Sequence, residues 1–136
     1  MKLLDEKTLA QTTYSEACKY LAALKSGIDR PSRFNPMLRY NICVLCFEKL
    51  FVAYIAHLGM MAEHHVPLAL FKETVKIDPA FPADFEEIAR SVGRFESICS
   101  IDGFGYQTPT DRDIQGMISG LIKINDYIEK KIGNNC

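Results

Sequence analysis

The chain has 136 residues, of which 48% are hydrophobic and 24% charged, and its formal net charge is −1. This length and composition are typical of one globular domain, so we expect residues 1–136 to form a single domain. The charge gives no support for RNA as a partner, and the longest apolar run, residues 50–56, is far shorter than the roughly 20 residues of a membrane-spanning helix.

The first residues and the cysteines both favour a cytoplasmic location. Asp5 and Glu6 lie where a secretory signal peptide has its apolar segment, which argues against secretion. The five cysteines are an odd number, and most lie in strongly helical segments. We therefore expect reduced thiols rather than a disulfide framework.

The first expected helix spans residues 7–26 and ends at Gly27. Its apolar residues recur at spacings of three, four and seven, which predicts one buried stripe: Ala10, Tyr14, Ala17, Leu21, Leu24 and Ile28. Residues 29–34 contain Pro31 and are expected to form a loop.

The most informative segment is residues 35–59, NPMLRYNICVLCFEKLFVAYIAHLG. Asn35 is a good N-cap, Pro36 suits the first helical position, and Gly59 suits the left-handed residue that ends a helix. Between these ends, almost every residue is apolar. A helix that is apolar on all sides is surrounded by other helices, so we expect this one to be the core of a helical bundle.

Three further helices complete the expected architecture. Residues 68–76 form a short helix, and residues 82–99 form a longer one. The last helix begins after Thr110, an N-cap with Asp113 three positions on, and ends at Gly133. No strand alternation is sustained, so the sequence predicts an all-α, antiparallel up-down bundle of four main helices plus one short helix.

Five polar residues are the candidate ligand-binding residues. Glu48 and Lys49 interrupt the apolar central helix, and a buried carboxylate must be paired, hydrogen-bonded or open to a cavity. Arg39 lies near the start of that helix, and His64 and His65 lie in the connector that follows it. We expect these five residues to line any pocket, with the cationic groups contacting phosphate and Glu48 ordering them.

Each candidate also has a structural interpretation. Glu48 can belong to a buried network with Asn41 and Arg90, Arg94 or a tyrosine of another helix. The two histidines can be ordinary loop residues, and Arg39 can cover apolar surface with its exposed stem.

Two short spacings predict packing rather than chemistry. Cys43 and Cys46 form a CxxC in the middle of an apolar helix, and no second ligand pair follows at regular spacing. We therefore expect small buried thiols there, and neither a metal nor a cofactor. Gly116 and Gly120 form a GxxxG in the last helix, which favours close approach of a neighbouring helix from the same or a second subunit.

The central helix resembles that of the HEPN family of small helical bundles. Residues 46–55, CFEKLFVAYI, are similar to the family's A-x-E-K-x-x-K-A-x-L pattern, although Val52 replaces its second lysine. Further matching residues follow along the chain: Gly59, His64, His65, Leu68, Ala69, Leu70, Tyr106, Thr110, Asp111 and Ile114.

This resemblance implies a HEPN-like fold and a homodimer. Family members that cut RNA carry an arginine, four to six residues and then a histidine, and this chain has no such pair. The resemblance therefore implies a non-catalytic binding or regulatory module, whose partner is a nucleotide, a nucleotidyltransferase or a toxin–antitoxin-type protein.

Two rival functions remain open. One is a degenerate ribonuclease or phosphotransferase that uses His64, His65 or Asp113. The other is a purely structural helical protein that joins a larger assembly and binds no small ligand.

Overall fold

The computed structural model describes the backbone of residues 2–26, 36–99, 109–133 and 136, and the side chains of residues 7–26, 36–95, 109–133 and 136. Across these ranges the chain is all-helical, without a strand, as predicted. The helices are α1 (Lys2–Ser26), α2 (Pro36–His57), α3 (Pro67–Ile77), α4 (Phe85–Cys99) and α5 (Asp111–Ile132). In the same ranges, no helix is both long and apolar enough to cross a membrane.

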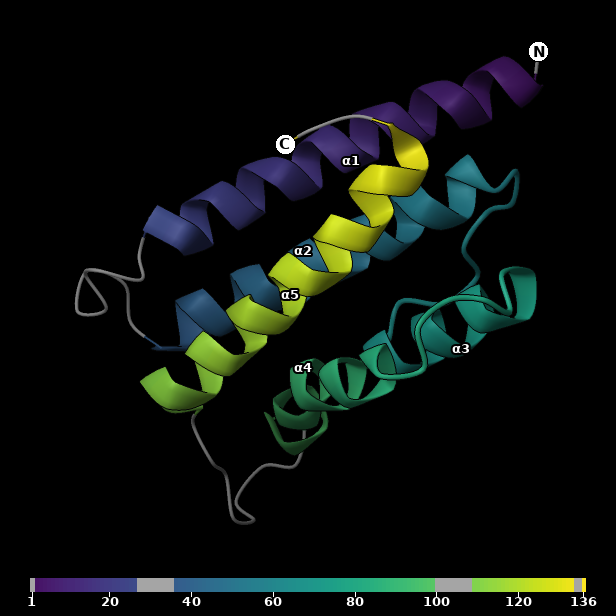
Figure 1. Cartoon of the computed structure of the whole chain (residues 1–136). Coiled ribbons are helices and arrows are strands. Elements are labelled where there is room, and N and C mark those ends of the chain that lie inside the picture. The colour runs from purple at the N-terminus through teal and green to yellow at the C-terminus, as the bar shows by residue number, and fades with distance from the viewer. Residues whose placement is uncertain (1, 27–35, 100–108, 134–135) are drawn as a thin grey trace.

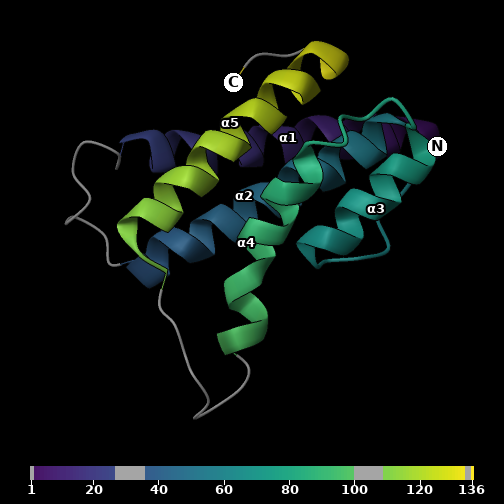
Figure 2. The same ribbon diagram turned by 60° about the horizontal axis from the view of Figure 1, so that its bottom comes forward.

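Helix α2 packs against all four other helices (Figures 1 and 2). The α1 helix lies antiparallel to α2, whereas α5 runs beside α2 in the same direction. The α4 helix crosses this layer steeply in Figure 2, and α3 lies beside the C-terminal half of α2. The start of α2 and the start of α5 therefore lie at the same end of the molecule.

The predicted signals at helix ends are confirmed wherever the structure describes them. Gly59 has φ 87°, and the N–H groups of Gly59 and Met60 donate to the carbonyl oxygens of Ala56 and Ile55. This is the Schellman arrangement, which satisfies carbonyl groups that the helix leaves unpaired. Thr110 and Asp113 form the predicted capping box.

Other boundaries differ from the prediction or fall outside the described ranges. The α1 helix begins at Lys2, five residues before the predicted start at residue 7. The α4 helix begins at Phe85, because the residues from Pro82 form a turn in which Phe85 donates to the Pro82 carbonyl at 3.2 Å. The following predictions lie outside the described residues or side chains: Gly27, Ile28, the loop 29–34, Asn35, Tyr106 and the side chain of Cys99.

Helix α2 is not buried on every side. Residues 53–56 are all buried, as the sequence predicts. In the first half, however, Leu38 and Leu45 are 43% and 38% exposed, and Asn41 is exposed as well. These three positions share one face of the helix, at spacings of three and four residues. The prediction of a helix surrounded on all sides is therefore wrong for this face.

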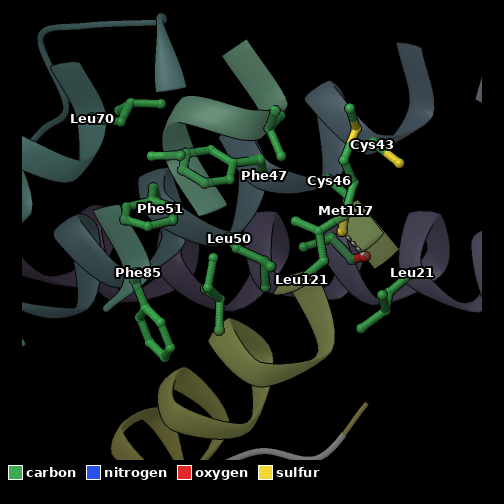
Figure 3. Packing of buried hydrophobic residues seen from close by; sticks show 14 of the residues in the cluster. Leu21, Cys43, Cys46, Phe47, Leu50, Phe51, Leu70, Phe85, Met117 and Leu121 are labelled. Atoms are coloured by element: carbon green, nitrogen blue, oxygen red, sulfur yellow. Dashed lines mark hydrogen bonds between the residues drawn. The ribbon is translucent and has the colours of Figure 1, made fainter. Parts of the chain in front are cut away.

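The core joins side chains from all five helices around α2. Phe47 and Phe51 of α2 stack with 4.3 Å between ring centres, and Leu21, Leu70 and Met117 approach them from α1, α3 and α5 (Figure 3). The predicted stripe of α5 is buried along its length, except for Ile132, which is partly buried: Ile114, Met117, Ile118, Leu121, Ile124, Asn125 and Ile128.

Gly116 and Gly120 differ in the space beside them, although both belong to the GxxxG of α5. A Cβ atom on Gly120 would lie 2.7 Å from Cγ2 of Ile88 on α4, whereas one on Gly116 would meet nothing within 4 Å. The predicted close approach of a helix is therefore found at Gly120, and the neighbour is α4 of the same chain.

We expect the same substitution to have opposite effects at these two glycines. Gly116→Ala removes a flexible residue from a helix and raises the free energy of unfolding by about 0.5–1 kcal/mol. Gly120→Ala forces the Ile88 side chain to move and lowers that free energy by about 1–3 kcal/mol. Urea denaturation of both variants measures the two changes, and a gain in stability at both positions would rule out the close contact.

Candidate functional site

A groove of about 300 Å³ lies between the N-terminal half of α1, the C-terminal half of α2 and the connector of residues 58–66. We call it the α1–α2 groove. It contains four of the five predicted site residues, Glu48, Lys49, His64 and His65. Its apolar lining comes from both helices and the connector: Leu9, Val52, Ala56, Met61 and Ala62.

Glu48 opens onto this groove instead of being sealed in the core. Its Oε2 atom lies 3.0 Å from Nδ1 of His65, and the Glu48 and His65 side chains are 27% and 86% exposed. An ionised carboxylate only accepts hydrogen bonds, so Nδ1 of His65 carries the proton and donates it. Nε2 of the neutral imidazole is then left with a free lone pair.

The neighbouring histidine is held in the same way by a residue that the sequence did not indicate. Nδ1 of His64 lies 2.9 Å from Oε1 of Glu73 on α3, and the backbone N–H of Glu63 donates to the same carboxylate. Burial raises the pKa of Glu73, but these hydrogen bonds outweigh it and hold the pKa below its ordinary value. Glu73 thus fixes the connector against α3.

The fixed charges of the groove are two carboxylates and one ammonium group. Nζ of Lys49 lies 3.7 Å from Oε2 of Glu16 on α1, and the two side chains are 31% and 44% exposed. A pair this open to water contributes little to stability. Lys49 is therefore available to a ligand at little cost, whereas Glu16 and Glu48 disfavour an anion nearby.

Arg39 lies apart from the other four candidates. It is nine positions before Glu48, which places it on the opposite side of α2 and about 13 Å along the helix axis. Its side chain is 1% exposed, with Nη1 3.3 Å from Oδ1 of Asp111 at the start of α5. The Nε and Nη2 atoms are buried and have no hydrogen-bond partner. The expectation that Arg39 lines the pocket, and the alternative of an exposed stem, are both inconsistent with this position.

The alternative network around Glu48 is not formed by the residues expected for it. Asn41 is exposed, and Arg90 donates to Glu86 within α4 at 2.7 and 3.0 Å. The Arg94 guanidinium carbon lies 5.7 Å from the centre of the Phe95 ring. Glu48 is paired with His65 because the connector folds back over α2, which residue spacing within helices does not report.

The cysteines separate into two groups. Cys43 and Cys46 are fully buried thiols, as predicted, and burial raises the pKa of each to about 12, so neither is reactive at neutral pH. Cys18 and Cys136, in contrast, form a disulfide across 118 positions of sequence. The expectation of reduced thiols is therefore wrong for this pair. Among the described residues, no cluster of three or more metal-binding side chains is placed to hold a metal ion.

A second polar cluster, also missed by the sequence, joins α2, α5 and the end of α3. Tyr54 and Tyr127 donate to Oδ2 of Asp78 at 2.7 and 3.1 Å. The hydrogen bond from Tyr54 is the largest cause of the lowered pKa of Asp78, and burial raises the pKa of Tyr54. The cluster is well satisfied and faces no described groove, so we assign it a structural role.

Comparison of the chain with protein-family models, with curated proteins and with solved structures found no match. Membership of the HEPN family therefore stays a prediction that depends on the residues quoted above.

Proposed function

We propose that this protein is a non-catalytic binding module and that the α1–α2 groove is its ligand site. The single observation that carries the proposal is the position of Glu48. A carboxylate in the middle of an apolar helix is costly unless it is paired or solvated. Glu48 instead faces a groove beside Lys49, His64 and His65, where it is accessible to a ligand.

The groove suits a small molecule with an apolar part and a polar end. Its volume of about 300 Å³ is at the lower end of the range for small-molecule sites. Val52 and Ala56 offer an apolar floor, while Lys49 and the two histidines offer donors at the rim. A mononucleotide, which the HEPN resemblance implies, would place its base on this floor and its phosphate beside Lys49.

The HEPN-like, up-down topology, the homodimer and a nucleotidyltransferase or toxin–antitoxin-type partner are further parts of this proposal. The central position of α2, which carries the matching residues 46–55, supports the topology. Light scattering on the purified protein tests the homodimer directly, since a strict monomer would remove that part of the proposal.

A second candidate function, catalysis at the connector, is favoured by one observation. Both His64 and His65 present a carboxylate to Nδ1, which is how an imidazole is oriented as a general base. Asp113, the third expected catalytic residue, is occupied in the capping box of α5. A His64→Ala/His65→Ala double variant that loses a measured RNA-cleaving activity of the wild type would favour the enzyme.

We expect AMP, ATP or GTP to bind the wild type in isothermal titration calorimetry, and Lys49→Gln to weaken that binding by about tenfold or more, because it removes the one fixed cation of the groove. Glu87→Gln, an exposed change on α4, is the matched control and should leave the affinity unchanged. If none of the three nucleotides binds while spermidine does, the ligand class is cationic and the nucleotide part of the proposal fails. If Lys49→Gln binds as tightly as the wild type, the groove is not the site.

A further inference from the structure

The Cys18–Cys136 disulfide links α1 to the residues that follow α5. Cys18 lies in the middle of α1 and is partly buried, Cys136 is exposed, and their Cα atoms are 5.2 Å apart. The backbone N–H of Cys136 also donates to Oε1 of Glu129 on α5 at 3.1 Å. The covalent bond therefore holds Cys136 across the contact between α1 and α5.

A buried polar pair lies directly beneath this bond. The Tyr14 hydroxyl on α1 donates to Oδ1 of Asn125 on α5 at 2.8 Å, and the two residues are 2% and 4% exposed. The Cys136 sulfur lies 3.5 Å from both oxygen atoms. A disulfide sulfur has no proton to donate, so its role here is to cover the pair and exclude water from it.

The disulfide is also open to attack from solvent. A shallow pocket of about 460 Å³ along α1 is lined by Cys18 and Cys136, with Tyr14 and Lys19 beside them. Thiol–disulfide exchange needs a thiolate to reach one of the two sulfur atoms, and a nearby ammonium group favours an approaching anion. The other thiols described by the structure, Cys43 and Cys46, have no such access.

From this geometry we propose that Cys18–Cys136 is a reversible redox clasp. A reducing dithiol attacks one sulfur atom through its thiolate, and its second thiol resolves the mixed disulfide. The dithiol is oxidised to a disulfide, and its two protons end on the Cys18 and Cys136 thiols. Cys136 then separates from α1 and uncovers the Tyr14–Asn125 pair, while the core around α2 stays folded.

The buried thiols of α2 provide an internal control for this proposal. Cys43 and Cys46 are each 0% exposed, so iodoacetamide reaches them only when the core opens. Treatment of the native protein with dithiothreitol, followed by iodoacetamide and peptide mass spectrometry, should label Cys18 and Cys136. It should label Cys43 and Cys46 at least about 100-fold more slowly, because their labelling requires unfolding.

Hydrogen exchange supplies the second measurement. Reduction should accelerate amide exchange around Tyr14 and Asn125 and leave residues 46–55 protected, and reoxidation should reverse the change. Labelling of Cys43 and Cys46 as fast as Cys18 would overturn the proposal, since the bond would then be a staple for the whole fold. A disulfide that resists dithiothreitol under native conditions would overturn it equally. Cys136→Ser should reproduce the exchange pattern of the reduced protein without any reductant.

Discussion

Phe51→Ala lowers the free energy of unfolding by about 3–5 kcal/mol. The Phe51 ring is 0% exposed, stacks on Phe47 at 4.3 Å and meets the ring of Phe81 edge-on at 5.5 Å between centres. Its removal exposes no new surface to water but leaves a cavity between α2 and the segment that joins α3 to α4. The cost is therefore the lost transfer of the ring from water plus the lost contacts around the cavity.

The matched control for Phe51→Ala is Leu45→Ala on the same helix. Leu45 is 38% exposed, so its truncation removes fewer contacts and should cost less than about 1.5 kcal/mol. Urea denaturation followed by far-ultraviolet circular dichroism measures both variants. Equal losses at the two positions would mean that the uncovered face of α2 is buried in solution, for instance against a second copy of the chain.

Much of the fold could be predicted because helix ends and apolar stripes are local properties of the sequence. Gly59 and Gly133 both adopt the positive φ that favours glycine, and Thr110 and Asp113 bond each other across three positions. A stripe at helical spacing identifies one buried face without knowledge of its neighbour. The exposed face of α2 is different, because Leu38 and Leu45 are apolar and only the arrangement of the other helices leaves them uncovered.

The candidate site was predicted in part for the same reason. Glu48 and Lys49 stand out because they interrupt an apolar helix, and the structure places both in the α1–α2 groove. Their partners are not local: Glu48 meets His65 across the connector, and Lys49 meets Glu16 of α1. Such pairs depend on how elements fold over one another, and nothing in the spacing of charged residues specifies them.

Arg39 shows how a long-range arrangement overrides a local expectation. An arginine near a helix start is ordinarily exposed, but the parallel course of α2 and α5 brings the start of α5 over it. Its guanidinium is buried with one partner, Asp111, and with two nitrogen atoms unpaired. Burial of an incompletely paired charge costs stability. The role of Arg39 is thus not explained by packing alone.

Removal of the Cys18–Cys136 bond lowers the free energy of unfolding by about 2–5 kcal/mol, with the upper end expected for so long a loop. The bond joins residues 118 positions apart, so it restricts nearly the whole unfolded chain. When the bond is absent, the unfolded state gains the entropy of that open loop, and the native state loses the cover over the Tyr14–Asn125 pair. Urea denaturation of the wild type, with and without dithiothreitol, measures the loss.

A double-mutant cycle separates the cross-link from the local contacts. Cys18→Ser and Cys136→Ser each remove the same bond, so each single variant and the double variant should lose nearly equal stability, and dithiothreitol should affect none of them further. Losses that add would show instead that each side chain acts through its own contacts. Because native domains are stable by about 5–15 kcal/mol, a loss of this size leaves a folded reduced form only if the core around α2 carries the remainder. The Cys18→Ser/Cys136→Ser variant should accordingly still unfold in one cooperative transition, at a lower urea concentration than the wild type.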